Sequence, residues 1–597
     1  MPPVRRQQQV FRTFDPLRSV ALSLRFLTGM VDRKLGCLPY GTVQPWITAP
    51  FAEHSRQDDA EHAATWFDAI SCAREMLGTD AGQDVQDALR EIVLDPECWD
   101  KQSGLRFPRR RPWSDTPFDY CVVTEQGPVL AALARMLELD PGDERARECA
   151  RSLVNGLHAL ALPHERRLTP GGAMELDSPT YSFPSDVVVR GSGPDPSLAT
   201  GYSDNVLRIL SLLHPLMAWY AVSGDETALD LATGLGNWAT GVSHPFGAKS
   251  EFHGEVHSAL VAAGGLARLG RVLSRDSYVA RAKALYDFVR RQTSSFGWVP
   301  DFMAWQLPGD LRGDSACTAA LLDCALDLVE CNFPEYWEDA NKIWRNQLVQ
   351  LQIPDAAFVP KEKDIPAPKP RDTPRRTYKR VAETLPGAFC GATSPSFVFL
   401  ASPRLVSARG SAEATRVMFR AWRNAVEDSK DIVTVNFPVN CETDSVLVQI
   451  GYPNEFQMRV EMRRTCRLNI RVYPWMGTPY EGTVDGRPIG IERREDHMLF
   501  PKLKKGSVAI FRHAAGQKHV LENVNSLDFY GIWRGPDMVD LLPHSTGPGY
   551  RLYQCALGVT RDPVPLPTSA LDGSPEPWFE PPVSKETRLN RRKAPRT

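Results

Sequence analysis

The sequence has no uninterrupted apolar run long enough to cross a lipid bilayer, which takes about 20 residues. It also lacks the apolar core of a signal peptide, because the stretch 21–27 behind the basic first residues is short and contains an arginine. The net charge is only −2, so the basic footprint of a nucleic-acid-binding protein is missing as well. From these absences we expect a cytoplasmic protein with no membrane and no nucleic-acid partner.

The twelve cysteines contain no C-x-x-C pair. Cysteines scattered in this way are typical of reduced thiols in a cytoplasm rather than of a disulfide framework. Hydrophobic residues make up 42% and charged residues 24% of the chain, which are the proportions of a soluble globular protein. A chain of 597 residues is too long for one ordinary domain, so two or three are expected.

Apolar residues recur at spacings of three and four over most of residues 51–428. The predicted helices are 60–77, 85–94, 128–139, 143–160, 205–222, 225–240, 254–273, 276–293, 317–329, 335–351, 391–400 and 411–428. Paired helices of this length are typical of a closed toroid or of an open solenoid. The long loops fall between the pairs and should gather on one face, which favours an (α/α)6 toroid as the catalytic domain.

Other segments break the helical pattern. Residues 1–50 and the loop 163–203 are expected to be irregular, and the excursion 354–384, rich in proline and basic residues, is expected to be exposed. Between 429 and 561 the period changes to two, which predicts an antiparallel β-sandwich. The tail 562–597 is rich in proline and basic residues and is predicted to be partly disordered.

Histidines, carboxylates and cysteines gather at the predicted loop-to-helix junctions. They stand in Phe-His-Gly-Glu-Val-His (252–257), Phe-Gly-Trp-Val-Pro-Asp (296–301), Gly-Asp-Ser-Ala-Cys-Thr (313–318), Trp-Arg-Asn-Gln-Leu (344–348) and Phe-Cys-Gly (389–391). In a helical barrel such junctions lie at one end. We therefore expect these stretches to form one pocket.

With these stretches, the helical pairs and the β module, the chain resembles the six-hairpin glycosidases. Within that group it is most similar to the bacterial β-L-arabinofuranosidases and their uncharacterised relatives, from residue 40 to residue 560. The resemblance implies hydrolysis of a terminal sugar in a pocket at the barrel mouth. It also implies a zinc ion held by a Glu-x-Cys motif and a Cys-Cys pair, one cysteine of which attacks the anomeric carbon, with an upstream glutamate as acid and base.

This sequence departs from that motif. Asp-Ser-Ala-Cys at 314–317 replaces Glu-x-Cys, and Phe-Cys at 389–390 replaces the Cys-Cys pair. Two thiolates and a displaced carboxylate form a poor four-ligand zinc site. We therefore expect no metal and no cofactor, and paired carboxyl groups take precedence over a cysteine nucleophile.

Three residues are candidates for catalysis. Asp301 follows Trp298, and burial beside an indole can raise a carboxyl pKa as a general acid requires, although an ordinary turn aspartate fits equally well. Asp314 is the candidate partner carboxylate, or simply the cap of the next helix. Cys390 keeps a minor role as a nucleophile, since the start of a helix behind it would lower the thiol pKa.

Other residues are candidate sugar contacts. His253 and His257 stand four residues apart at the start of a predicted helix, so both should lie on one face. That spacing also fits a capping and packing pair, or two metal ligands. Aromatic side chains stack on sugar rings. The full set of candidate contacts is His253, His257, His54, Trp113, Tyr120 and Trp298.

Three functions fit the sequence, and each takes a carbohydrate as its partner. The first is a glycoside hydrolase acting on a terminal sugar through paired carboxyl groups. The second is a lyase or epimerase for uronic-acid sugars, with Tyr120 or His253 as base and Arg109 neutralising the substrate carboxylate. The third is a non-catalytic carbohydrate-binding protein, because fold alone does not fix function.

Overall fold

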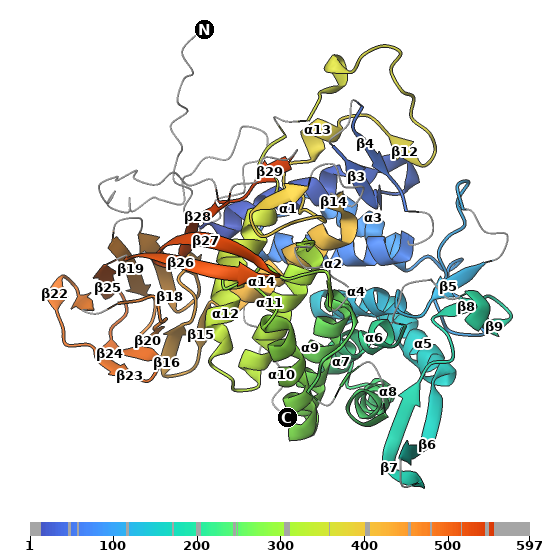
Figure 1. Ribbon diagram of the computed structural model, residues 1–597, viewed down its shortest axis with the longest axis horizontal. Helices are drawn as coiled ribbons and strands as arrows, with labels where there is room; N and C mark the ends of the chain where they lie inside the picture. The colour runs from blue at the N-terminus through green and yellow to red at the C-terminus, as the bar shows by residue number, and fades with distance from the viewer. Residues whose placement is uncertain are drawn as a thin grey trace.

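The computed structural model combines a helical part with a C-terminal β-rich part (Figure 1). It describes residues 14–45, 49–55, 59–114, 119–169, 172–198, 205–242, 246–247, 249–303, 311–356, 359–399, 406–451, 455–477, 480–514, 516–543 and 549–553. The predicted tail at 562–597 lies outside these residues.

Six helices contact one another in a closed cycle, each packing against the next and the last against the first. In chain order they are α2 (Asp59–Leu77), α4 (Gln126–Leu139), α7 (Leu213–Ser223), α9 (Val256–Leu273), α11 (Ser315–Glu330) and α14 (Ala408–Arg423). We call these the inner helices.

A second set of helices packs against the inner helices. It comprises α1 (Pro16–Gly29), α3 (Gln83–Val93), α5 (Glu144–Leu160), α8 (Glu226–Asn237), α10 (Asp276–Arg290) and α12 (Tyr336–Lys342). Each of the last five follows its inner helix after a short turn, which makes the two neighbours antiparallel. Asp225 caps α8, its side chain accepting from the backbone of Thr227 at 3.0 Å.

The prediction that residues 1–50 are irregular is wrong for α1. Asp15 caps this helix by accepting from the backbone N–H of Arg18 at 3.1 Å, and Pro16 occupies its first turn. Leu24 and Leu27 are fully buried against the helical part. An isolated helix as short as α1 is only marginally stable in water. Its stability therefore comes from packing against α2 and α14.

Strands also occur where the sequence predicted only loop or helix. A hairpin of β6 (Leu162–Thr169) and β7 (Gly172–Ser182) stands in the expected loop 163–203. The predicted helix 391–400 is absent from the described part of that segment, where β13 (Phe397–Phe399) is found instead. β6 and β7 pair with each other, whereas β13 pairs with the distant strand β29 (Gly549–Arg551), a partner that the local pattern cannot show.

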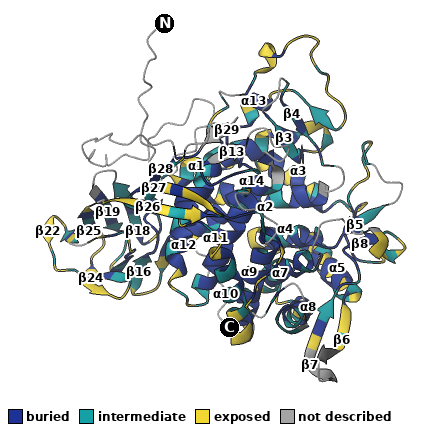
Figure 2. Ribbon diagram, in the orientation of Figure 1, coloured by how far each residue is buried: buried dark blue, intermediate teal, exposed yellow. Residues whose placement is uncertain are grey.

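The excursion 354–384 is largely exposed, as predicted (Figure 2). Its strand β12 (Arg376–Thr377) pairs with β4 (Phe51–Glu53) in a sheet completed by β3 (Thr42–Gln44) and β14 (Val406–Ser407). Arg375 and Arg376 both form ion pairs with Glu53. Charge pairing therefore fixes the end of the excursion to the N-terminal strands.

The C-terminal part contains a five-stranded and a six-stranded sheet. In sheet order they are β15 (Val426–Asp428), β16 (Ile432–Val435), β20 (Cys466–Arg471), β24 (His497–Leu503) and β23 (Glu492–Arg494), then β17 (Cys441–Glu442), β18 (Val446–Gly451), β19 (Glu455–Met462), β25 (Val508–Ala514), β21 (Glu481–Val484) and β22 (Arg487–Pro488). Phe456, Met458 and Val460 are buried, which confirms the predicted alternation. The expectation of purely antiparallel strands is wrong for β16 and β20, which run parallel.

A three-stranded sheet joins the two parts of the chain. It consists of β26 (Gln517–Val524), β27 (Leu527–Arg534) and β28 (Asp537–Leu542). Asn346 donates to the backbone oxygen of Pro536 at 2.9 Å and accepts from the backbone of Met538 at 2.8 Å. Arg345 pairs with Asp537 at 3.1 Å. The Trp-Arg-Asn motif at 344–346 thus holds the β-rich part against the helices.

Candidate active site

The topology gathers the long connections at one end of the helix cycle. Each inner helix leaves through a short turn and is entered from a long segment, such as 238–255, 291–314 or 352–407. Because successive helices are antiparallel, all six inner helices begin at the same end. We call this end the mouth.

Seven charged or titratable side chains meet at the mouth, and they come from α2, α9 and α14 and from the segments that lead into α9 and α11. They are Glu61, Glu255, His257, Asp301, Asp314, Arg409 and Glu413, and we call them the mouth cluster. The backbone holds the loop in place, since Asp301 accepts from the N–H of Val256 at 3.0 Å. The adjoining strands β10 (Gly254–Glu255) and β11 (Phe302–Met303) pair Glu255 with Phe302. Asp301 and Glu255 therefore lie at neighbouring positions.

His257 is held at both ring nitrogens by protein side chains. Its Nε2 lies 2.8 Å from Glu413 Oε2, and its Nδ1 lies 3.3 Å from a guanidinium nitrogen of Arg409. Arginine only donates hydrogen bonds, so in the neutral form of the ring Nδ1 accepts from Arg409 and the N–H at Nε2 donates to Glu413. The side chain is 6% exposed. A sugar contact through His257, as the sequence predicted, would have to displace one of these partners.

His253 and His257 were predicted to share one face of a helix, and this prediction is wrong. The α-helix begins at Val256, and the preceding Gly254 and Glu255 are in strand β10. His253 is exposed and His257 is buried. The backbone pairing with β11 overrides the helical register on which the prediction rested.

Arg409 connects the start of α14 to that of α2. It donates to Glu413 at 2.8 Å and to Glu61 at 3.0 Å. Burial acts to raise the pKa of Glu413, but His257 and Arg409 outweigh it and lower that pKa to about 2. The Arg-x-x-x-Glu spacing of Arg409 and Glu413 was the signal for this pair. The predicted helix began at residue 411, so the sequence reading missed it.

The pKa values of Asp314 and Glu255 are shifted in opposite directions. Burial raises the pKa of Asp314, although its side chain caps α11 by accepting from the backbone of Cys317 at 2.6 Å. Burial also acts to raise the pKa of Glu255, but His257 and Arg409 outweigh that effect and lower this pKa. The capping role that the sequence offered for Asp314 is therefore present, and Glu255, which was passed over, belongs to the site.

The cysteines at the mouth are enclosed. Cys317 and Cys390 are each 1% exposed, and burial raises the pKa of both thiols far above the ordinary value. Cys390 precedes no helix in the described residues, so the expected source of a lowered thiol pKa is missing. Among the described residues no three His, Cys, Asp or Glu side chains converge as metal ligands. The donor set does not fit the zinc site of the resembling family.

His54 lies inside an aromatic stack. Its ring is 4.2 Å from that of Tyr40 and 5.2 Å from that of Trp113, with interplanar angles of 22° and 6°. Its Nδ1 lies 3.0 Å from the backbone oxygen of Pro39, and burial lowers its pKa. The imidazole is 2% exposed. His54 thus supports Trp113, whose other face is the part left for a ligand.

The remaining aromatic candidates differ in exposure. Trp298 is 1% exposed, and its indole nitrogen lies against Gly313, so its face is not open for stacking on a sugar. Tyr120 and Trp113 are half-buried. Burial raises the pKa of the Tyr120 hydroxyl. Arg109, invoked for binding a uronic acid, pairs with Asp95 at 2.6 Å.

The apolar stretch Val206–Ser223, which spans α6 (Asn205–Leu210) and α7, is the one described segment long and apolar enough to cross a membrane. Half of it is buried inside the protein. Its place in the closed helix cycle accounts for its apolar character.

No family model and no curated protein matches the chain. Among solved structures it is similar to a GH127 β-L-arabinofuranosidase from Geobacillus stearothermophilus T6, with 14% identity over 87% of this chain and 80% of that chain and a TM-score of 0.53. A GH127 β-arabinofuranosidase gives 12% identity, 88% and 81% coverage and a TM-score of 0.54. A cellobiose 2-epimerase from Bacillus thermoamylovorans covers 68% of this chain and 99% of its own, with 12% identity and a TM-score of 0.43. The two GH127 structures confirm the resemblance predicted from the sequence, and at these identities they establish the fold alone.

Proposed function

We propose that the protein is a glycoside hydrolase that removes a terminal sugar at the mouth of the helix cycle. One observation carries the proposal: Asp314 and Glu255, at the starts of two neighbouring inner helices, have pKa values shifted in opposite directions. Carboxyl groups separated in this way can serve as a proton donor and an ionised partner at one pH. Glycosidases need such a pair.

The roles follow from the protonation states. A raised pKa favours the protonated Asp314, which can donate its proton to the glycosidic oxygen as the bond to the anomeric carbon breaks. Ionised Glu255 stabilises the positive charge that develops at that carbon and accepts the proton that the attacking water loses as its oxygen becomes the new hydroxyl group. Asp301, predicted from the sequence as the acid, is proposed as a third carboxyl group beside Glu255.

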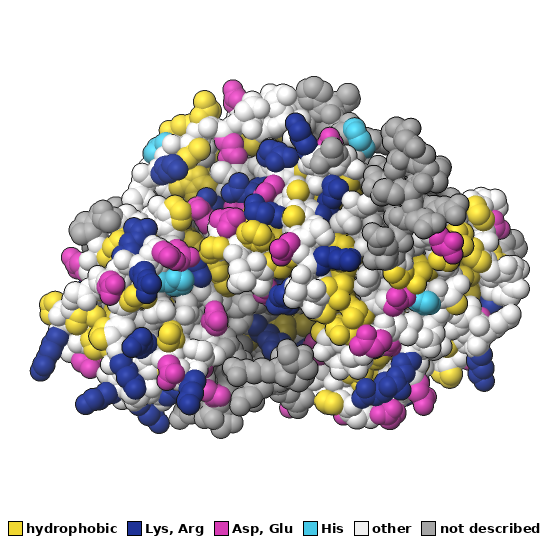
Figure 3. All heavy atoms as spheres, turned by 90° about the horizontal axis from the view of Figure 1, so that it is seen from below, with side chains coloured by type: hydrophobic (Ala, Val, Ile, Leu, Met, Phe, Trp, Pro, Cys, Tyr) yellow, Lys and Arg dark blue, Asp and Glu magenta, His cyan; other side chains and the backbone are white. Residues whose placement is uncertain are grey.

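The charge balance of the mouth cluster favours a neutral sugar over a uronic acid. Five carboxyl groups face one arginine and a histidine whose proton is shared with Glu413. A substrate carboxylate would be repelled there, and Arg109 is already ion-paired. On the face seen in Figure 3, basic and acidic side chains are interspersed. These features support hydrolysis of a neutral glycoside rather than a uronate-directed lyase or epimerase.

The proposal also assigns the surroundings of the site. His253, Trp113 and Tyr120 are placed as walls of the pocket, because each is at least partly exposed. The helix cycle is taken as the wall of an (α/α)6 toroid that begins at α1. The two larger C-terminal sheets are taken as the expected β-sandwich.

Hydrolysis of a panel of chromogenic glycosides tests the proposal. We expect release of sugar by the wild-type chain, and a loss of about 10²–10⁴-fold in kcat for Asp314→Asn and Glu255→Gln. Asp276→Asn, at the exposed start of α10, is the matched control and should keep full activity. An unsaturated product absorbing in the ultraviolet would show a lyase instead. Equal activity of Asp314→Asn and Asp276→Asn would show that Asp314 is not the general acid.

A further inference from the structure

A cavity of about 310 Å³ runs along the inside of the helix cycle. All six inner helices line it. It reaches from Arg409 and His257 at the mouth to Glu138 and Arg423 at the opposite ends of α4 and α14. Glu138 and Arg423, at the end away from the mouth cluster, are exposed to solvent.

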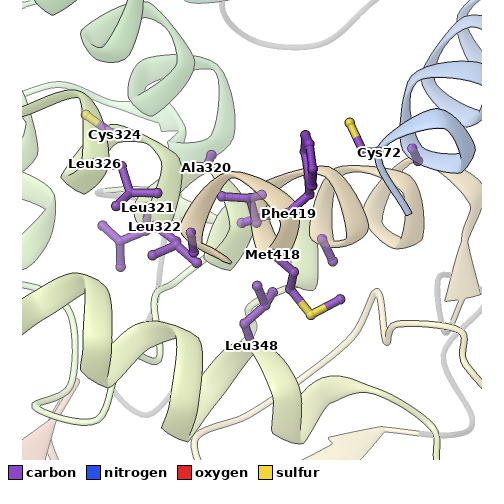
Figure 4. Packing of buried hydrophobic residues seen from close by; sticks show 14 of the residues in the cluster. Cys72, Ala320, Leu321, Leu322, Cys324, Leu326, Leu348, Met418 and Phe419 are labelled. Atoms are coloured by element: carbon purple, nitrogen blue, oxygen red, sulfur yellow. The ribbon is translucent and has the colours of Figure 1, made fainter. Parts of the chain in front are cut away.

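Small side chains keep this cavity open. Ala131, Ala218 and Ala320 line it from three different inner helices, together with Gly127 and Gly264. Ala131 and Ala218 are only partly buried although they face the inside of the cycle. A leucine at either position would fill space that the native chain leaves empty. Figure 4 shows Ala320 and Phe419 beside the apolar packing of α11 and α14.

Ion pairs form the polar wall of the cavity. Arg416 donates to Asp323 at 2.6 Å, Arg420 lies 2.5 Å from both Asp323 and Asp327, and Arg268 lies 2.8 Å from Asp327. The side chains of Arg416 and Arg268 nevertheless keep 28% and 20% of their surface accessible. Guanidinium groups inside a helix cycle can be accessible only where the cavity reaches them.

Two polar atoms of this wall lack a hydrogen-bond partner among the described residues. They are Asp327 Oδ2 and His214 Nε2, the second of which lies 3.5 Å from Asp323 Oδ2 without a hydrogen bond. The Asp327 side chain is 1% exposed, and burying an acceptor without a partner costs free energy. Both groups border the cavity at Gly264, where Asp327 Oδ2 and the His214 ring approach the glycine backbone.

The charges of the wall decide which kind of molecule fits. An anion would meet Asp68, Asp323 and Asp327, and a cation would meet Arg268 and Arg416. A neutral molecule with several hydroxyl groups can accept from the guanidinium groups and donate to the carboxylates at the same time. The volume lies at the lower end of the range for small-molecule pockets, which suits one sugar ring rather than an oligosaccharide.

We propose that the cavity inside the helix cycle is a second binding site, for one neutral monosaccharide or similar polyol. The cavity shares His257, Arg409 and Glu413 with the mouth cluster at one end, but the proposed ligand lies further along α9, α11 and α14, and the proposal does not depend on the hydrolase proposal. The wall formed by Asp323, Asp327, Arg268 and Arg416 supplies the hydrogen bonds, and the alanines supply the space.

Isothermal titration of the full chain tests this with L-arabinose, D-galactose, D-glucose and D-xylose, and with sodium sulfate as the anionic probe. We expect saturable binding of at least one sugar in the wild-type chain and in Asp314→Asn. The cavity-filling variant Ala131→Leu/Ala218→Leu should bind that sugar at least tenfold more weakly. Ala280→Leu, on the exposed side of outer helix α10, is the matched control and should bind normally.

Three results would overturn the proposal. One is the absence of saturable binding by all four sugars, which would leave a cavity holding water alone. Another is binding of sulfate in place of a sugar. The third is sugar binding that Asp314→Asn abolishes and the cavity-filling variant keeps, because the sugar would then occupy the mouth. If circular dichroism shows that the double variant is unfolded, Ala218→Leu alone provides the same comparison. The readout is binding, so failure of the hydrolase proposal would not affect it.

Discussion

Glu413 Oε2 on α14 lies 2.8 Å from His257 Nε2 on α9, and this contact fixes the tautomer of a buried histidine at the mouth. Arg409 completes the arrangement by reaching Nδ1 of the same ring. A carboxylate in this position orients the imidazole.

The pKa of Glu413 predicts a specific loss of stability in acid. Folding lowers it from an ordinary 4.5 to about 2. As the pH falls, this carboxylate therefore gains a proton in the unfolded chain before it does so in the folded protein. The stabilisation present above pH 4.5 is lost as the pH falls toward 2. Glu413→Gln should lower the free energy of unfolding at pH 7 by about 3 kcal/mol and flatten this part of the pH profile. Urea denaturation at a series of pH values measures both effects.

The control for this variant is Glu138→Gln, whose carboxylate is 47% exposed in its pair with Arg135. An exposed pair contributes about 0–1 kcal/mol. If both variants show the same acid sensitivity as the wild-type chain, the contact with His257 does not stabilise the fold.

The opposite shifts of Asp314 and Glu255 predict a bell-shaped dependence of kcat/KM on pH. Activity should fall at high pH as Asp314 loses its proton at a raised pKa, and at low pH as Glu255 gains one at a lowered pKa. In Glu255→Gln the residual activity should lose its acidic limb and keep its alkaline limb. A profile that Glu255→Gln leaves unchanged in shape would contradict the assignment of the ionised partner.

Cys390 should be dispensable for chemistry. Its thiol is buried and its pKa is raised by that burial, so the thiolate needed for attack is disfavoured. We expect Cys390→Ser to keep most of the activity, whereas Asp314→Asn loses about 10²–10⁴-fold. Elemental analysis of protein purified without chelators should find less than one zinc per chain. A full equivalent of zinc, together with an inactive Cys390→Ser, would restore the cysteine mechanism.

Gly313 is required where the loop enters α11. An added Cβ would lie 2.4 Å from the backbone oxygen of Val299 and 3.0 Å from the indole nitrogen of Trp298. Gly313→Ala should therefore lower the free energy of unfolding by about 1–3 kcal/mol and displace the adjoining Asp314. Gly477→Ala, where nothing lies within 4 Å, should change it by less than about 0.5 kcal/mol. Equal melting temperatures for the two variants would show that the junction can relax.

The sequence predicted the elements whose pattern is local. Helical spacing placed most of the inner and outer helices, and the alternation at Phe456, Met458 and Val460 placed β19 in the β-rich part. Asp485 and Gly486 form the turn between β21 and β22, with positive φ angles of 51° and 77°. Such patterns are readable because burial of one face requires them along a single stretch of chain.

The errors lie where distant segments compete with a local pattern. Strand pairing with β11 removed the first turn of the predicted helix at Gly254, and so separated His253 from His257. Packing against α2 and α14 stabilised α1, which the sequence reading left irregular. Neither partner can be identified from the segment itself.

By itself, the sequence determined the helical pairs, the change to strands, and the junctions that carry the carboxyl groups. Only the tertiary structure decided which of those groups act on one another. Glu61 and Arg409 meet because α14 closes the helix cycle against α2, and that closure brings together the two ends of the helical part. Electrostatic shifts depend on distances of a few ångströms and on burial, and both quantities arise only when the cycle closes.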